Sequence, residues 1–238
     1  MTLRLLLTSS GLRNETQREA LNDLLGQPTE ESNIVYLPTA SVAERGDHGW
    51  FVADLNRVHG LGWGEFDILE LNGLPRELVL ERLRHADVIY AEGGNHYHLA
   101  RSLTENGLAE DFRELLESRV YVGVSAGSMI FSSRLDERSA DVIGDVADLH
   151  LLGATTIRPP LGLFDWYLKP HLYSPDFPER DDAWAEAIAA AADFPIYFID
   201  DQTAIRVDGA EIEVVSEGTW RHFPGPGPVS APVTLPES

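Results

Sequence analysis

The feature that most constrains this chain is a serine between two glycines at the end of an apolar strand. Valines alternate over residues 120–124, which predicts a buried strand, and a helix-like segment follows Ser125. This layout is typical of a nucleophile elbow, a sharp turn that exposes the serine above the carboxyl end of the strand. Gly123 and Gly127 let the strand and helix backbones approach each other closely. An ordinary strand-to-helix turn would have the same pattern, so the motif alone does not distinguish a catalytic serine from such a turn.

Strand and helix patterns alternate along most of the chain, which predicts a mostly parallel sheet covered on both faces. Strands are expected at Arg4–Thr8, Asn33–Leu37, Phe66–Leu71, Asp87–Tyr90, Val120–Val124 and Pro195–Ile199. Helices are expected at Glu15–Leu25, Trp50–His59, Pro75–Ala86, His98–Asn106, Leu108–Ser118 and Asp181–Ala192. Ligands of such sheets bind beyond the carboxyl ends of the strands. We therefore expect Gly93–Gly94 and Ser125 to open onto one crevice.

Two segments depart from this alternation. Asp136–Leu152 is acidic and poorly periodic, which predicts a loop with short elements. Ala204–Val207 and Glu211–Val215 flank an Asp-Gly pair and are expected to form a hairpin. We expect residues 1–222 to form a single α/β domain and the Pro-rich residues 223–238 to form an irregular tail.

The charge balance bears on the partners of the protein. The 238 residues include 39 acidic and 18 basic side chains, giving a net charge of −21, which argues against nucleic-acid binding. No apolar run is long enough to span a membrane. Cysteine is absent, so disulfides and thiolate chemistry are excluded, and a cytoplasmic location is expected. An acidic substrate would need a local arginine to offset the repulsion.

A serine nucleophile needs a base, and the base needs an acid that orients it. The order Ser125, Asp201, His222 would suit an α/β-hydrolase, whereas the order Ser125, His171, Asp201 would suit another fold with the same chemistry. His96 and His98 lack a nearby cysteine or paired carboxylate, so no metal site is expected.

Four motifs in order along the chain resemble the peptidase E family. They are Gly93–Asn95, Gly123–Gly127, the segment from Leu163–Phe164 to Pro170–His171, and the strand ending at Asp200–Asp201. The similarity extends from about Leu3 to Val207. This family comprises aspartyl dipeptidases whose fold is related to class I glutamine amidotransferases, with serine in place of cysteine. The resemblance implies a three-layer α/β/α sandwich with a mostly parallel central sheet.

The resemblance also implies catalytic roles. Ser125 corresponds to the nucleophile and His171 to the base of the family. Asp201 stands where the family has a glutamate that orients the base, and Asp141, soon after the elbow, is a second candidate for this role.

The expected oxyanion hole consists of the backbone N–H groups of Gly94 and Ala126. Asn95 is expected to contact the substrate as part of the Gly-Gly-Asn turn. Arg180 matches the arginine that holds the side-chain carboxylate of the substrate in relatives that cleave after an N-terminal aspartate. The loop from His171 to Arg180 is shorter than in those relatives, and pairing of Arg180 with neighbouring carboxylates is the alternative.

The predicted function is therefore that of a serine peptidase acting on short peptides, a dipeptidase with a preference for N-terminal aspartate. The expected partner is a small peptide, no cofactor is expected, and a homodimer is left open. An esterase or acyl hydrolase of the same fold is the nearest alternative. A non-catalytic, amidotransferase-like binding module is the alternative from another class.

Overall fold

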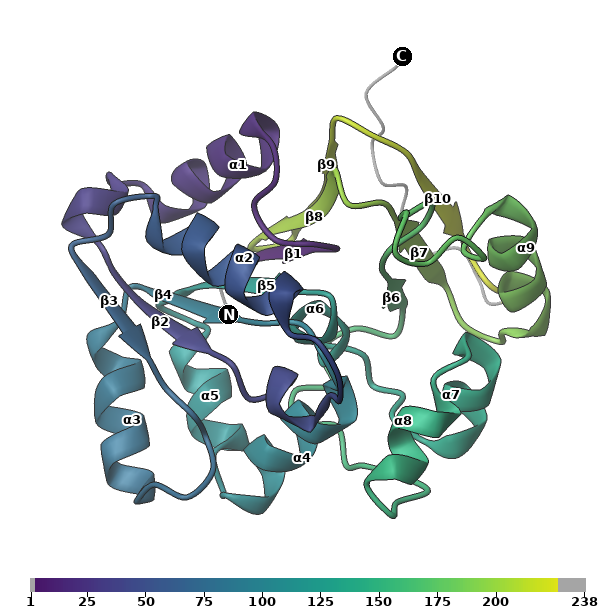
Figure 1. Ribbon diagram of the computed structural model, residues 1–238, viewed down its shortest axis with the longest axis horizontal. Coiled ribbons are helices and arrows are strands. Elements are labelled where there is room, and N and C mark those ends of the chain that lie inside the picture. The colour runs from purple at the N-terminus through teal and green to yellow at the C-terminus, as the bar shows by residue number, and fades with distance from the viewer. Residues whose placement is uncertain (1–2, 227–238) are drawn as a thin grey trace.

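A seven-stranded sheet forms the centre of the computed structural model, which describes residues 3–226 (Figure 1). From edge to edge its strands are β3 (Glu65–Ile68), β2 (Asn33–Leu37), β4 (Val88–Ala91), β5 (Val120–Val124), β1 (Arg4–Thr8), β8 (Thr203–Asp208) and β9 (Glu211–Ser216). The first five run parallel, whereas β8 and β9 each run antiparallel to the preceding strand in this order. The prediction of a mostly parallel sheet is confirmed.

Helices cover both faces of this sheet, as the alternating pattern predicted (Figure 1). One face is covered by α1 (Glu15–Leu25) and α2 (Gly49–His59), and the other by α3 (Arg76–His85), α4 (His96–Glu105) and α5 (Ala109–Leu115). Local sequence explains the bounds of α1. The Asn14 side chain accepts from the backbone N–H of Gln17 in a capping box, and Gly26 ends the helix in the left-handed conformation.

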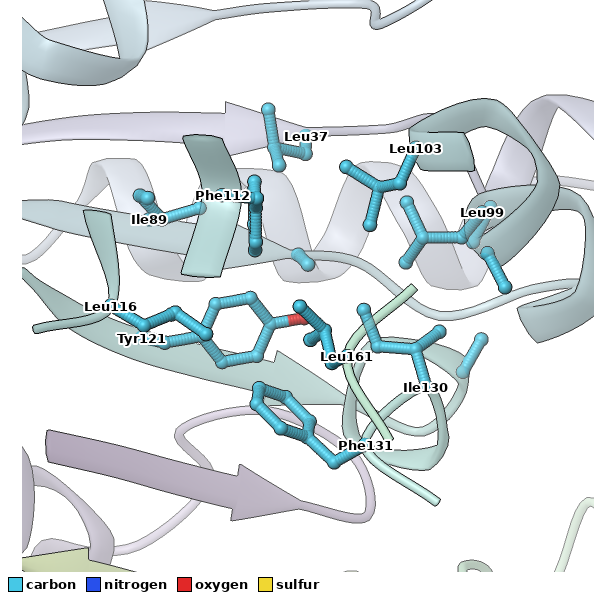
Figure 2. Packing of buried hydrophobic residues seen from close by; sticks show 14 of the residues in the cluster. Leu37, Ile89, Leu99, Leu103, Phe112, Leu116, Tyr121, Ile130, Phe131 and Leu161 are labelled. Carbon is cyan, nitrogen blue, oxygen red and sulfur yellow. The ribbon is translucent and has the colours of Figure 1, made fainter. Parts of the chain in front are cut away.

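The hydrophobic core divides into one cluster on each face of the sheet. Figure 2 shows part of the cluster beneath α4 and α5, where the buried Tyr121 ring of β5 packs edge-on against Phe131 and Phe112. The Tyr121 hydroxyl donates to the Gly127 carbonyl at 2.7 Å. The core thus fixes the segment immediately after the elbow, because Gly127 and Phe131 both lie just beyond Ser125.

A second, three-stranded sheet lies beside the first and was not predicted. Its order is β10 (Trp220–Phe223), β7 (Ile196–Ile199) and β6 (Tyr167–Lys169). The helix α9 (Asp182–Ala191) packs on it together with α7 (Glu137–Ile143). The segment with His222 belongs to β10 and pairs antiparallel with β7.

The remaining short elements connect these layers. They are η1 (Thr29–Glu31), η2 (Ser41–Ala43), α6 (Ala126–Met129) and α8 (Val146–Leu151). The segment expected as a loop, Asp136–Leu152, contains α7 and α8. Of the predicted tail, Phe223 belongs to β10, and residues 227–238 lie outside the described residues. Within residues 3–226, no helix has the length and apolar character needed to cross a membrane.

Candidate active site

Ser125 lies at a sharp turn between β5 and α6 and has a positive φ of 45°, unusual for a residue with a side chain. The turn brings the backbones so close that a Cβ on Gly127 would lie 2.2 Å from the Ala91 carbonyl oxygen. A Cβ on Gly123 would lie 2.7 Å from the Gly127 backbone. The Ser125 N–H donates to the Thr8 carbonyl at 3.0 Å. The two glycines therefore serve the close approach that the motif predicted.

Ser125, His171 and Asp201 form one hydrogen-bonded chain. The distance between Ser125 Oγ and His171 Nε2 is 3.1 Å, and that between His171 Nδ1 and Asp201 Oδ1 is 3.0 Å. His171 follows β6, and Asp201 follows β7. Because β6 and β7 are parallel neighbours, their carboxyl ends meet and the imidazole reaches the carboxylate. The structure thus brings together the three residues predicted as nucleophile, base and orienting acid.

The neighbours of Asp201 hold it in the ionised form. Burial raises the pKa of this carboxyl, but hydrogen bonds from His171, Ser9 and Ser174 outweigh burial and lower the pKa to about 2. The hydroxyls of Ser9 and Ser174 donate to its two oxygens at 2.8 and 3.0 Å. An ionised carboxylate only accepts hydrogen bonds, so His171 Nδ1 carries the proton that faces Asp201. His171 Nε2 then has a free lone pair for the Ser125 hydroxyl.

A cavity of about 710 Å³ opens over these residues. Gly93, Gly94 and Ser125 all line it, which confirms the single crevice expected from the strand ends. A Cβ built on Gly93 would lie 3.4 Å from Ser125 Cβ, so the glycine turn faces the nucleophile. Charged side chains from several elements also line the cavity: Arg13, Glu44, Arg45, Asp54, Arg57, Glu92, Asp145, Asp148, Lys169, Asp176 and Arg180.

Arg180 lies beside the triad, with a side chain that is 17% exposed. Its guanidinium lies 3.9 Å from the centre of the Phe177 ring, and this ring stacks on His171 at 4.9 Å. Desolvation lowers the pKa of Arg180. The predicted alternative was pairing with a neighbouring carboxylate. The structure shows only a loose contact of this kind, with Arg180 Nε 3.8 Å from Glu179 Oε1. The Asp181 side chain instead caps α9.

Asn95 does not take the place that was predicted for it. Its side chain is fully buried; Oδ1 accepts from the His98 N–H at 2.9 Å, and Nδ2 donates to the Asp148 carbonyl at 3.0 Å. It therefore caps α4 and ties this helix to α8, and we correct its assignment from substrate binding to structural support.

Neither His222 nor Asp141 lines the cavity that contains Ser125. The His222 ring stacks on Tyr197 in the three-stranded sheet, and Asp141 is exposed on α7. His96 is buried, and its Nε2 lies 2.9 Å from the Tyr167 hydroxyl. Among residues 3–226, no group of three or more His, Cys, Asp and Glu side chains could hold a metal ion.

Sequence reasoning missed two buried ionic groups that line the cavity. Lys169 donates to Asp145 Oδ1 at 2.5 Å, and both side chains are buried. Asp54 and Glu92, which are both buried, form the second group. Lys169 was visible as the only lysine of the chain, immediately before the Pro-His pair, whereas nothing local in sequence joins Asp54 to Glu92.

Comparison with known proteins identifies the family of this chain. Residues 5–215 match the model of peptidase family S51. The chain is 29% identical over 182 residues to an uncharacterized peptidase of Pasteurella multocida, covering 75% of this chain and 83% of the relative. It is 28% identical over 226 residues to a Drosophila melanogaster protein named "Probable alpha-aspartyl dipeptidase", covering 94% of this chain and 90% of the relative.

A solved structure shows the same fold. It is a crystal structure of a candidate peptidase E protein from Listeria monocytogenes, with a TM-score of 0.73 and 20% identity, covering 92% of this chain and all of the other. The family match covers most of the chain and includes Ser125, His171 and Asp201. The chain therefore belongs to peptidase family S51, and it is a serine-type peptidase.

Proposed function

We propose that this peptidase is a dipeptidase that forms an acyl-enzyme on Ser125, with a preference for substrates that begin with aspartate. The observation that carries the proposal is the hydrogen-bonded chain from Ser125 through His171 to Asp201. A serine hydroxyl is a weak nucleophile unless a base takes its proton, and this chain supplies a base with its acceptor nitrogen facing the hydroxyl.

In each half of the reaction His171 takes up one proton and then releases it. Ser125 Oγ attacks the peptide carbonyl while its proton moves to His171 Nε2, and Asp201 stabilises the resulting imidazolium. The tetrahedral intermediate collapses when His171 gives this proton to the leaving amine. Water then attacks the acyl-enzyme with His171 again as the base, and the acid product leaves with Ser125 restored.

The N–H groups of Gly94 and Ala126 receive the oxyanion. Gly94 lines the cavity with Ser125, and Ala126 is the next residue along the elbow. Within the described part of the chain, neither N–H donates a hydrogen bond to another protein group. Both donors are thus available to a charge that develops on the substrate carbonyl oxygen.

Arg180 binds the side-chain carboxylate of the N-terminal aspartate. Its guanidinium is largely buried, is held over Phe177 and has only a loose carboxylate partner. In a chain of net charge −21, a guanidinium beside the nucleophile offsets the repulsion of an acidic peptide. The Drosophila relative is named as a probable alpha-aspartyl dipeptidase, which supports the same substrate class.

Steady-state kinetics on Asp-Leu, Leu-Leu and an N-acylated peptide test the proposal. The wild type should prefer Asp-Leu, and Ser125→Ala should lower kcat by about three orders of magnitude or more because the nucleophile is lost. Near-wild-type peptidase activity of Ser125→Ala would refute the assignment of the nucleophile. Preference for a small ester over all three peptides would favour the acyl hydrolase instead.

A separate substitution tests the preference for N-terminal aspartate. Arg180→Met should cost about 2–4 kcal/mol in kcat/KM on Asp-Leu and hardly change Leu-Leu, because only Asp-Leu has a side-chain carboxylate for Arg180 to bind. Arg206→Met is the matched control, since Arg206 is also 17% exposed but pairs with Glu213 and Asp208, away from the cavity. Equal losses on both substrates would leave a serine peptidase without this preference.

A further inference from the structure

The three residues of the proposed triad come from two different sheets. Ser125 follows β5 of the seven-stranded sheet, whereas His171 and Asp201 follow β6 and β7 of the three-stranded sheet. The 3.1 Å contact between Ser125 and His171 therefore depends on how the two sheets are aligned at this point. A contact that crosses the boundary beside the imidazole would fix this alignment.

Ser9 makes that contact. It directly follows β1, the neighbour of β5, and Thr8 pairs in register with Val124 next to Ser125. The buried Ser9 hydroxyl accepts from the His171 backbone N–H at 2.8 Å and donates to Asp201 Oδ1 at 2.8 Å. It also lies 3.3 Å from His171 Nδ1. One hydroxyl of the large sheet thus holds both members of the triad that belong to the small sheet.

We propose that Ser9 is a positioning residue, whose hydroxyl aligns His171 and Asp201 with Ser125 across the boundary between the two sheets. This inference rests on the proposed catalytic role of Ser125. A hydroxyl suits the position because it can donate and accept at the same time. As a donor, the Ser9 hydroxyl orients the Asp201 carboxylate. As an acceptor, it fixes the backbone N–H of His171.

The backbone of His171 shows why a fixed acceptor is useful. His171 has a φ of 66°, a left-handed conformation that residues with side chains adopt infrequently. Leu172, the next residue, donates to the Ile199 carbonyl of β7 at 3.1 Å, which ties the loop to its own sheet. Ser9 supplies the corresponding tie to the other sheet.

Ser174 offers a natural comparison. Its hydroxyl donates to Asp201 Oδ2 at 3.0 Å, and it follows β6 like His171. It therefore orients the same carboxylate without joining the two sheets. If alignment of the sheets is the function of Ser9, loss of the Ser9 hydroxyl should cost more activity than loss of the Ser174 hydroxyl.

The test measures kcat and KM on the best dipeptide for Ser9→Ala and for the pair Ser9→Thr and Ser9→Val. Threonine and valine have nearly the same shape, so the pair isolates the hydroxyl. We expect kcat to fall by about 10- to 100-fold in Ser9→Ala and Ser9→Val, from the loss of hydrogen bonds to a charged site, with KM changed less than about threefold. Ser9→Thr should recover most of the kcat of the wild type.

Two further variants complete the design. Ser174→Ala should lose less kcat than Ser9→Ala, and Ser102→Ala should keep wild-type kinetics, because the buried Ser102 hydroxyl donates to the His98 carbonyl on α4. Thermal melts identify any variant that fails to fold; the comparison of Ser9→Thr with Ser9→Val then decides the question.

Wild-type kcat in Ser9→Ala, or equal kcat in Ser9→Thr and Ser9→Val, would overturn this inference while leaving an inactive Ser125→Ala, and thus the proposed function, intact. Full activity of Ser125→Ala would instead remove the proposed function itself.

Discussion

Asp201 and Glu92 are carboxyl groups that line the same cavity, yet their neighbours favour opposite protonation states. Asp201 is surrounded by donors, namely His171, Ser9 and Ser174, which outweigh the effect of burial and lower its pKa to about 2. Glu92 is buried beside the Asp54 carboxyl; burial, together with this negative neighbour, raises its pKa well above the usual range although Tyr36 donates to it.

The comparison shows that the balance between burial, neighbouring charges and hydrogen-bond donors sets the direction of each pKa shift within one cavity. Asp54, the neighbour of Glu92, accepts from the Tyr90 hydroxyl at 2.8 Å and from Arg57 Nη1 at 2.5 Å. The cavity therefore has one carboxyl whose pKa is lowered, beside His171, and one whose pKa is raised, immediately before the Gly93–Gly94 turn.

The largest expected effect distinguishes the two acids by catalysis. Asp201→Asn should lower kcat on the order of 10⁴-fold, because the amide favours the wrong tautomer of His171. Glu92→Gln should lower kcat by less than about tenfold, because glutamine resembles the neutral acid in shape and hydrogen bonding.

Kinetics at neutral pH measure both variants, with Asp141→Asn on the exposed face of α7 as the control. Losses of similar size in Asp201→Asn and Glu92→Gln would remove the distinction between the two acids. A larger loss in Asp141→Asn than in Asp201→Asn would make Asp141 the orienting acid.

Gly11→Ala should disturb only the Asp54–Glu92 group. A Cβ on Gly11 would lie 2.4 Å from Asp54 Oδ1 and 2.7 Å from the Tyr90 hydroxyl, and the φ of this residue is +78°. We expect the free energy of unfolding to fall by roughly 2–4 kcal/mol from strain and displacement of these buried groups. Urea unfolding measures this loss. Gly73→Ala is the matched control, since Gly73 also has a φ of +78° but has no atom within 4 Å of its added Cβ. Equal losses in the two variants would assign the effect to φ alone.

A smaller effect distinguishes the two acids by pH. The stability that Glu92 contributes is fully present below its unfolded pKa of 4.5 and is lost as pH rises, because its folded pKa is raised. Glu92→Gln removes this loss, so its free energy of unfolding should exceed that of the wild type near neutral pH and match it below about pH 4.

Asp201 should show the reverse dependence. Its folded pKa is lowered, so its contribution is present above the unfolded pKa of 3.8 and is lost as pH falls toward 2. Urea unfolding of Asp201→Asn, Glu92→Gln and the wild type from about pH 2 to pH 7 measures how the free-energy difference between each variant and the wild type changes with pH. Changes of the same sign in the two variants would contradict the opposite pKa shifts.

The smallest effect concerns the histidine that an α/β-hydrolase order would use. His222→Ala should change kcat by less than about twofold, because the His222 ring stacks on Tyr197 and does not line the cavity. A loss comparable with that of His171→Ala would move the base to His222 and favour the α/β-hydrolase order, in which Asp201 is still the acid.

The sequence predicted what depends on local pattern. The strands β1, β2 and β5 and the helix α1 occur at the predicted residues, because alternating apolar runs and caps are encoded within each segment. The resemblance to peptidase E also selected His171 rather than His222. Neither composition nor spacing alone could make that choice, since both histidines follow the elbow along the chain.

Contacts between distant segments were not predictable in this way. β6 is a strand of three residues that is stabilised by pairing with β7, so its own sequence carries little signal. Ser9 meets His171 and Asp201 across more than 160 residues of chain. Asn95 was expected to contact the substrate because the Gly-Gly-Asn turn was expected to face it. In the structure, the Asn95 side chain caps α4 instead.

The central claim is that Ser125 is a nucleophile activated by His171. Labelling with a fluorophosphonate, followed by peptide mapping, tests it most directly, because this probe reacts with activated serines. We expect one label per chain, on Ser125, with none in Ser125→Ala and a strongly reduced rate in His171→Ala. A label on another serine, or an equal rate in His171→Ala, would contradict the claim.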